Sequence, residues 1–438
     1  MSESARPATA AILTLGCKLN IADSEAMARR LRDAGWSVAD RVPEGGAEAV
    51  IVNTCSVTHV ADQKSRHLVR LARRLAPNAT VALTGCLLET APREKLDPLA
   101  ADLVYRQPDQ QALADRIIEL RPMPPLPLGE GRGEGGLPAP SAVIRPALKT
   151  RAFISAQEGC NDVCAFCIIP RTRGRERSKS VEDVVVEAQA REAEGVQEVV
   201  ITGTQLGAYG RDSGVRNRLS VLLGALLSET RIARIRMSSV QPQDITPELI
   251  GLWGDSRLCR HFHLALQSGS ATVLQRMRRR YTQQEYREAV ARLRAAIPDV
   301  AITTDVIVGF PGETDAEFEE SYAFCREIAF EGVHVFPYSQ RQGTVAFKMS
   351  DQVPEPVKKQ RVHRLIALAD EMARAYRERF IGRTLPVLWE SRRDDAWEGL
   401  TDTYTRVRAR SDADMTNQLT PARLTGAYQA GLLGEVLP

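Results

Sequence analysis

The sequence predicts an α/β protein in three parts: an N-terminal parallel α/β sheet domain, a central partial (β/α)6 barrel and a small C-terminal β-barrel. Over most of the chain, short apolar runs alternate with segments of helical periodicity, which is typical of parallel sheets covered by helices. A Pro/Gly-rich stretch divides this alternation into two blocks. Beyond about residue 380, short β-type runs between turns replace it and predict the small barrel.

The N-terminal block, 1–121, contains three apolar runs, each followed by a helical segment. The runs are 12–16, 49–53 and 80–85. In the segment after the second run, Leu68, Leu71 and Leu75 recur at helical spacing and predict its buried face. We therefore expect three strands of one parallel sheet with helices packed on it.

The stretch 122–145 is expected to be a linker. Residues 122–140 hold six prolines and five glycines, a composition that cannot form a helix or a central strand. A docking motif for a partner that binds Pro-rich segments is the alternative reading of the same composition.

The second block, 146–380, repeats the strand and helix pattern six times. The candidate strands are 152–156, 198–203, 234–240, 262–267, 302–310 and 332–339. Helical segments such as 181–194 and 283–296 lie between them, and 355–380 reads as one long helix. Six β/α units predict a partial barrel whose active site lies at the carboxyl ends of the strands. Residues 381–438 form the predicted C-terminal β-barrel.

Composition limits the class of protein. Of 438 residues, 43% are apolar, which excludes wholesale disorder, and no run approaches the roughly 18 apolar residues of a membrane helix. The first residues do not read as a secretion signal, so we expect a cytoplasmic protein without a membrane partner. Eight cysteines then fit disulfides poorly, because cytosolic reductants keep thiols reduced. The net charge of +3 does not by itself indicate a polyanionic partner.

The densest cysteine group is Cys160, Cys164 and Cys167, with spacing C-x3-C-x2-C. Three thiolates on one loop can hold three corners of a metal cluster, and soft thiolates favour zinc, copper or iron–sulfur centres. Structural zinc needs a fourth Cys or His nearby, and 168–180 contains neither. A four-iron cluster with one open corner fits best. Zinc, or three buried structural cysteines, are the alternatives.

A second, more widely spaced trio is Cys17, Cys55 and Cys86. Each follows the end of a predicted parallel strand, and ligands of such sheets bind at the carboxyl edge. Their loops could therefore converge on a second three-thiolate cluster; small residues buried at strand ends are the alternative. Cys259 and Cys325 have no companions and read as packing residues.

These motifs resemble those of the radical S-adenosylmethionine (SAM) methylthiotransferase family over nearly the whole chain. CNDVCAFC matches the superfamily's three-cysteine signature, including an aromatic residue, Phe166, before the third cysteine. Further matching segments follow in the family's order: TLGCKLNIADSE, VNTCSVTHVADQKSR, TGCLLE, TGTQLGAYG, LQSGSATVLQRMRRRYT, DVIVGFPGET and FPYSQRQGT. The tail is similar to a TRAM domain, a small RNA-binding barrel, with Glu390 and Tyr404 at matching positions.

The resemblance implies two 4Fe-4S clusters, each held by three cysteines. The cluster on Cys160, Cys164 and Cys167 would bind and reductively cleave SAM, and the cluster on Cys17, Cys55 and Cys86 would hold the sulfur to be transferred. A low-potential donor such as flavodoxin or ferredoxin would supply electrons. The implied SAM contacts are Phe166, Gly203, Gln205, Ser238, Gln267 and Gly309. Gly309, with Gly312 and Glu313, could equally form a turn that starts a helix.

Within the family, GCKLN, NTCSVT and SRHLVR look most like the branch that methylthiolates N6-threonylcarbamoyladenosine beside the tRNA anticodon. The isopentenyladenosine branch and the branch that modifies an aspartate of a small-subunit ribosomal protein are the alternatives. A non-catalytic iron–sulfur protein that binds RNA or carries electrons is the alternative from another class; an open cluster corner disfavours it, since carriers usually close their clusters with four ligands.

Three basic runs are consistent with a tRNA anticodon stem-loop as partner. They comprise Lys64, Arg66, Arg70, Arg73 and Arg74; Arg171, Arg173, Arg175, Arg177 and Lys179; and Arg276, Arg278, Arg279 and Arg280. Phosphate contacts by such residues would make binding salt-sensitive, although solvated helix faces are the commoner reason for a basic run. The tail departs from an RNA-binding pattern, because 384–438 holds six Lys/Arg against eight Asp/Glu.

Overall fold

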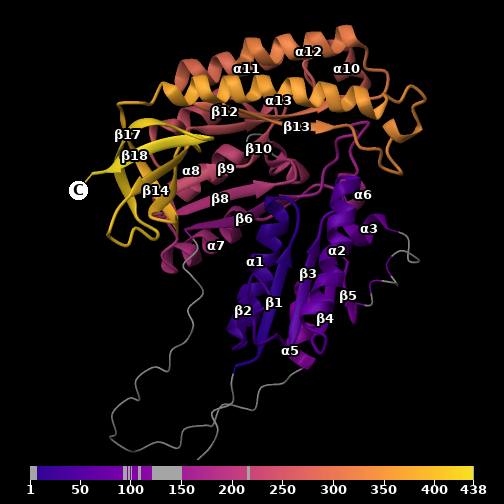
Figure 1. The fold of residues 1–438 in the computed structure, drawn as a ribbon, viewed down its shortest axis with the longest axis vertical. Helices are drawn as coiled ribbons and strands as arrows, with labels where there is room; N and C mark the ends of the chain where they lie inside the picture. The colour runs from indigo at the N-terminus through magenta and orange to yellow at the C-terminus, as the bar shows by residue number, and fades with distance from the viewer. Residues whose placement is uncertain are drawn as a thin grey trace, which may run out of the picture. The chain divides into compact units, whose positions relative to one another are not determined.

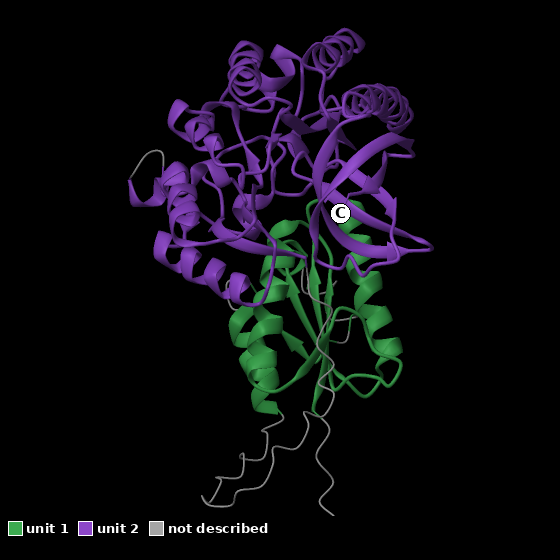
Figure 2. Cartoon of the chain, turned by 90° about the vertical axis from the view of Figure 1, so that its left-hand side faces the viewer, with its two compact units in different colours: residues 1–148 green, residues 149–438 purple. Residues whose placement is uncertain are grey.

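The computed structural model describes residues 7–91, 96, 99, 101–106, 110–120, 150–214 and 218–437. The chain divides into two compact units, residues 1–148 and 149–438 (Figure 2). The predicted linker, 122–145, lies outside the described residues. None of the helices in the described ranges is long and apolar enough to cross a membrane.

The first unit is a parallel five-stranded sheet with helices on both faces (Figure 1). The strand order is β2-β1-β3-β4-β5, for β1 (Thr9–Thr14), β2 (Ser37–Ala39), β3 (Ala49–Thr54), β4 (Thr80–Gly85) and β5 (Leu103–Val104). The helices are α1 (Lys18–Asp33), α2 (His59–Leu75), α3 (Leu87–Thr90) and α5 (Gln110–Leu120). Successive β1 side chains alternate between two apolar layers, one with α1 and α5 and the other with α2 and α3.

The buried face of α2 differs from the predicted one. Val69 and Ala72 are fully buried, whereas Leu75 is 51% exposed. The hydroxyl of Ser65 accepts a hydrogen bond from the backbone N–H of Cys55 and donates one to its carbonyl. This polar contact turns Ser65 toward the sheet, and Val69 and Ala72 follow it at helical spacing, so the prediction for Leu75 was wrong.

The second unit begins with a partial barrel. Its strands are β6 (Arg151–Glu158), β7 (Arg177–Ser178), β8 (Glu198–Gly203), β9 (Arg234–Met237), β10 (Ser239–Val240), β11 (His261–Leu264), β12 (Ala301–Val308) and β13 (Gly332–Pro337). All strand pairs in it are parallel except that of β6 with β7. The order is β7-β6-β8-β9 in one sheet and β10-β11-β12-β13 in the other, and Ser238 alone separates β9 from β10. The predicted six-strand arrangement is confirmed.

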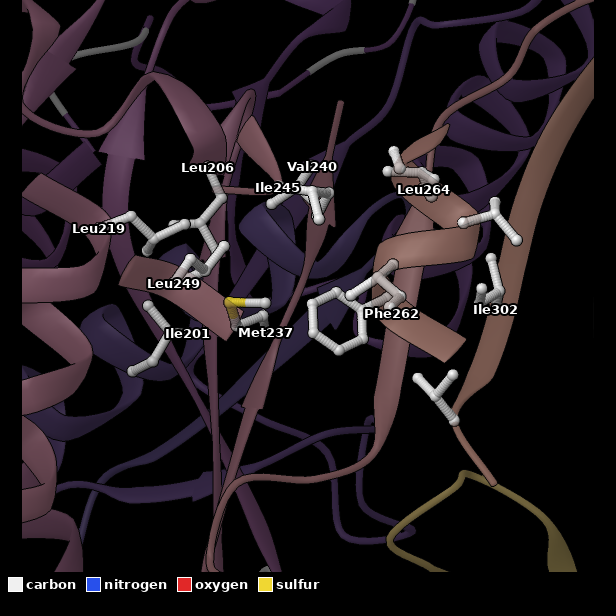
Figure 3. Close-up of a cluster of buried hydrophobic side chains, with 14 of the residues drawn as sticks. Ile201, Leu206, Leu219, Met237, Val240, Ile245, Leu249, Phe262, Leu264 and Ile302 are labelled. Atoms are coloured by element: carbon white, nitrogen blue, oxygen red, sulfur yellow. The ribbon is translucent and has the colours of Figure 1, made fainter. Parts of the chain in front are cut away.

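Helices cover the outer face of these strands. The longer ones are α7 (Val181–Ala193), α8 (Arg218–Glu229), α11 (Gln283–Ala296), α12 (Asp315–Ile328) and α13 (Glu355–Glu378), with α6 (Ile169–Thr172), α9 (Pro247–Ile250) and α10 (Ala271–Arg276) as short connectors. Figure 3 shows part of the apolar layer between strands and helices, where Met237 and Phe262 from the strands share one cluster with Leu219 and Leu249 from the helices. Packing the outer face in this way leaves the inner face for polar side chains.

The chain ends in a closed five-stranded barrel, as predicted. The strand order is β14-β15-β16-β18-β17, for β14 (Thr384–Arg393), β15 (Ala396–Thr401), β16 (Arg406–Arg410), β17 (Leu419–Tyr428) and β18 (Gly431–Val436). It contacts residues at the amino ends of the partial-barrel strands. Arg151 lies 2.6 Å from Glu390 and donates a 3.0 Å hydrogen bond to the hydroxyl of Tyr404, while Arg236 donates to the carbonyl of Asp402. Glu390 and Tyr404 therefore attach the C-terminal barrel to the central one.

Candidate active site

The loop with Cys160, Cys164 and Cys167 leaves the carboxyl end of β6, where a (β/α) barrel places its active site. Gly159 starts this loop at φ 70°, and a Cβ there would lie 1.9 Å from the carbonyl oxygen of Arg175, so only glycine fits. Farther along, the Ala165 N–H donates to the Met277 carbonyl, and the Ala165 carbonyl accepts from Ala346. The loop is thus held by its backbone.

Two of the three thiols of this loop, those of Cys160 and Cys167, have raised pKa values. Burial, with a smaller contribution from the charges of Cys164 and Cys160, raises the pKa of Cys167 to about 12. Burial also raises the pKa of Cys160 to about 11, against the opposing effect of the Asp162 N–H, which donates to its sulfur at 3.4 Å. Thiols with such pKa values stay protonated at neutral pH unless a metal displaces the proton. A set of soft donors that needs a cation to ionise fits an iron–sulfur cluster.

Arg279 approaches the same cluster of cysteines from another part of the barrel. Its guanidinium donates a 3.2 Å hydrogen bond to the sulfur of Cys164. Tyr281 holds it in place through a 3.1 Å hydrogen bond and a ring contact at 4.9 Å, and the Tyr281 hydroxyl donates to the Leu266 carbonyl. A fixed positive charge therefore faces the sulfur of Cys164.

Three polar side chains, those of Gln157, Gln205 and Ser238, lie where the cysteine loop meets the next strand ends. The amide of Gln157 donates to the carbonyls of Glu158 and Gly159, and its oxygen accepts a 2.9 Å hydrogen bond from the Gln205 N–H. Gly203 donates its N–H to the hydroxyl of Ser238 at 3.3 Å. Gly203, Gln205 and Ser238, three of the predicted SAM contacts, therefore lie together beside the cysteine loop.

The other predicted SAM contacts lie at further strand ends. Gln267 has φ 70° and pairs by its backbone with Val306, just after β11. Gly309 follows β12 at φ 71° and donates its N–H to Glu313, in a turn before α12, whose N-cap is Thr314. That is the geometry of a helix-start turn. Phe166 packs against the apolar group of Val273, Met277, Phe310 and Tyr338.

Cys17, Cys55 and Cys86 follow β1, β3 and β4, which are adjacent strands of the first unit. A Cβ added to Gly16 would lie 3.0 Å from the Cβ of Cys55, and the N–H of Cys86 donates to the carbonyl of Thr54. Burial raises the pKa of Cys55, and the charge of Cys17 raises it further. The three loops therefore lie at one edge of the sheet, and those of Cys17 and Cys55 flank the point between β1 and β3 where the connections switch direction.

Two buried asparagines tie these loops together. Asn20 donates to the carbonyls of Leu15 and Thr54 at 2.8 and 2.9 Å. Asn53 donates to the carbonyl of Asn20 and to the hydroxyl of Ser24. Both lie in segments that the sequence had singled out for their cysteines, so the signal for them was present, but their contacts depend on strand order. Sequence reasoning missed Asn20, Asn53 and Gln157 as supporting residues, and it placed Arg279 only in a basic run.

Several residues of the three basic runs form contacts within the protein. Arg73 pairs with Asp102 at 2.7 Å, Arg276 with Glu317 at 2.8 Å, and Arg279 points to Cys164. Arg173 is buried near Glu158. Lys64, Arg70 and Arg74 on α2 and Arg171, Arg175 and Arg278 in the second unit are exposed.

Comparison with known proteins agrees with this arrangement. Residues 154–325 match the radical SAM superfamily, and residues 9–105 match the uncharacterized protein family UPF0004. The chain is 38% identical to threonylcarbamoyladenosine tRNA methylthiotransferase MtaB of Bacillus subtilis (strain 168), over 96% of this chain and 94% of that one. It is 35% identical to tRNA-2-methylthio-N(6)-dimethylallyladenosine synthase of Moorella thermoacetica, over 97% and 98%. The fold resembles that of the radical SAM methyltransferase TsrM from Kitasatospora setae, with TM-score 0.52 and 16% identity over 76% and 75% of the chains.

The fold and the cysteine-bearing strand ends define an enzyme of the radical SAM class, which uses a four-iron cluster and SAM. At this level of identity over nearly its whole length, the chain belongs to the radical SAM methylthiotransferase family.

Proposed function

We propose that this enzyme converts N6-threonylcarbamoyladenosine next to the tRNA anticodon to its 2-methylthio derivative. The observation that carries the proposal is the pair of three-cysteine sites, each at the carboxyl edge of a parallel sheet, in a chain 38% identical to a relative named for this reaction. A second relative with that name, from Thermotoga maritima, is 36% identical over 87% of this chain. Two relatives named as dimethylallyladenosine synthases have lower identities, 35% and 31%.

When bound, the two clusters supply one-electron reduction of SAM and the sulfur that is transferred. Cys160, Cys164 and Cys167 would hold the first, and Cys17, Cys55 and Cys86 the second. An unactivated ring carbon has no acidic proton, so acid–base catalysis alone would fail, and separating radical generation from sulfur delivery accounts for two sites. The protein's own contribution is to position and polarise the reactants.

The supporting residues suit that division of work. Gln157, through Gln205 and Gly159, connects the SAM-side loop to the end of β8, where Gly203 and Ser238 bond to each other and are proposed SAM contacts. Arg279 offsets negative charge on Cys164. Phe166, Gln267 and Gly309 remain candidates for SAM contact, and a low-potential carrier such as flavodoxin or ferredoxin is the proposed electron donor.

Exposed cations support an RNA partner. Lys64, Arg70 and Arg74 lie on α2, the helix that follows the Cys55 loop. The C-terminal barrel gives less support for RNA binding, since Glu390 and Tyr404 face the central barrel. We therefore assign RNA binding first to α2, with an affinity that falls steeply as salt rises.

Nucleoside mass spectrometry of tRNA tests the substrate assignment. Cells without the gene should lack 2-methylthio-N6-threonylcarbamoyladenosine and regain it on complementation. Loss of the 2-methylthio isopentenyl nucleoside instead would assign the other adenosine substrate. An unchanged tRNA with an unmodified ribosomal aspartate would move the protein to the third branch, and either result overturns the proposal.

Metal analysis and two variants test the two-site mechanism. Anaerobically prepared enzyme should contain about eight iron and eight sulfide per chain. Cys164→Ala should abolish SAM cleavage, whereas Cys17→Ala should retain some cleavage and lose methylthio transfer. Zinc in place of iron, or a normal yield of modified nucleoside from Cys17→Ala, contradicts the mechanism; full iron content without SAM cleavage would indicate a non-catalytic iron–sulfur protein.

A further inference from the structure

Three side chains with metal-binding atoms, none of them a cysteine, gather on the inner face of the partial barrel. They are His263 on β11, Asp305 on β12 and His334 on β13. One atom of each lies within 4.8 Å of the others. His263 Nε2 is 3.3 Å from Asp305 Oδ2, and His334 Nδ1 is 3.1 Å from Asp305 Oδ1.

The strand register produces this group. His263 is paired with Thr303 across β11 and β12, and Asp305 with His334 across β12 and β13. Thr303 and Asp305 are two residues apart, so their side chains share one face. The neighbours at alternate positions, Phe262 and Val306 among them, pack in the outer apolar layer. Three adjacent parallel strands thus hold the group on a rigid frame.

One arrangement of the hydrogen bonds around His263 leaves room for a cation between the ring and the carboxylate. Thr303 Oγ1 lies 3.2 Å from His263 Nδ1 and 3.1 Å from His261 Nε2. If His263 donates its Nδ1 proton to Thr303, which in turn donates to His261, the Nε2 lone pair faces the Asp305 oxygen at 3.3 Å. Two lone pairs at that distance repel unless a proton or a metal ion lies between them. A hydrogen bond to the second ring nitrogen is also the usual support of a metal-binding histidine.

We infer that His263, Asp305 and His334 bind a divalent first-row transition-metal ion, separate from either cysteine site. Ligand atoms about 2.0–2.2 Å from a tetrahedral Zn2+ lie roughly 3.3–3.6 Å apart, close to the separations seen here. Two imidazoles and one carboxylate suit zinc or iron and not magnesium. The His334 side chain is 68% exposed and that of Asp305 31%, so coordination positions remain open to water or a ligand, as in exchangeable rather than structural sites.

Zinc binding by the holoenzyme tests the site, and its result is independent of the nucleoside assay of the proposed function. Cluster-loaded, chelator-washed enzyme is dialysed against buffered Zn2+, and zinc and iron are counted together by elemental analysis. The wild type should take up one zinc per chain without losing iron. Asp305→Asn and His334→Gln should bind that zinc at least tenfold more weakly at unchanged iron content, and Mg2+ should not compete.

The matched control is His363→Gln, because His363 is an exposed histidine on α13; it should bind zinc as the wild type does. Unchanged iron content in every variant shows that the fold and the cysteine sites are intact. If the iron-replete wild type takes up no zinc, or if Asp305→Asn takes up as much as the wild type, the group is a hydrogen-bonded His–Asp–His array and the inference fails.

Discussion

Replacing Arg236 by methionine should weaken the contact between the partial barrel and the C-terminal barrel and lower the stability of the unit that contains both. Arg236 forms two hydrogen bonds to Glu198, at 2.8 and 3.1 Å, and both side chains are 0% exposed. The same guanidinium donates to the Asp402 carbonyl at 2.9 Å and lies 4.7 Å from the centre of the Tyr404 ring. One side chain therefore connects β8, β9 and the turn that follows β15.

The decrease in the free energy of unfolding follows from these contacts. Removing one partner of a buried ion pair destabilises proteins by about 3–5 kcal/mol, because the other charge stays buried. Burial raises the pKa of Glu198, and Arg236, with Arg234 at 4.0 Å, more than offsets this in the wild type. Without Arg236, Glu198 can take up a proton, which limits the loss to about 3 kcal/mol near neutral pH. Its folded-state pKa then exceeds the unfolded value, so the deficit should grow as pH rises.

Thermal melting followed by tryptophan fluorescence measures this change, since Trp389 and Trp397 are buried in the C-terminal barrel. We expect a fall of about 6 °C, at roughly 2 °C per kcal/mol for a unit of this size. Adding Glu198→Gln should recover much of it, since no charge is then left buried. The control is Arg364→Met. Arg364 also pairs with a glutamate, Glu319, and lies 5.1 Å from the centre of the Phe318 ring, but its side chain is 44% exposed. Replacing it should therefore lower the free energy of unfolding by less than about 1 kcal/mol. Equal shifts for Arg236→Met and Arg364→Met would refute the reasoning.

Three further variants probe the cysteine sites. Gly159→Ala should lower iron content by about half, because its Cβ would meet the Arg175 carbonyl at 1.9 Å; full iron loading would contradict this. Asn53→Leu should lower the iron content of the site of Cys17, Cys55 and Cys86 by a similar amount, since it removes two buried hydrogen bonds between the cysteine loops. If SAM cleavage fell as far as methylthio transfer, the loss would not be confined to that site. Arg279→Gln should keep its iron. The reduction potential of the SAM-side cluster should become more negative by about tens of millivolts, because a positive charge beside Cys164 favours the reduced state. Redox titration followed by electron paramagnetic resonance checks the sign.

Much of the architecture could be predicted because its signals are local. The strand runs 80–85 and 198–203 and the helix 283–296 coincide with β4, β8 and α11. The short strands β2, β5 and β7 were missed, since two or three residues carry no readable alternation. The buried face predicted for α2 differs from the observed one because a polar residue, Ser65, faces the sheet. A hydrophobic pattern cannot reveal such a contact.

The role of individual basic residues was also beyond the sequence. Arg276, Arg278, Arg279 and Arg280 form one run, yet Arg276 pairs with Glu317 and Arg279 reaches Cys164. Arg278 sits between them with φ 57°. Such a turn sends consecutive side chains in different directions, so a run of like charges does not remain one patch.

By itself the sequence determined the α/β alternation and the placement of six cysteines after strand ends, because periodicity and motif spacing are properties of neighbouring residues. Only the tertiary structure decided what surrounds them: that Gln157 and Arg279 serve one cysteine loop, that Asn20 and Asn53 join the others, and that His263, Asp305 and His334 meet. These contacts join residues up to 115 positions apart, and the order and register of strands that bring them together are set by the packing of the whole sheet.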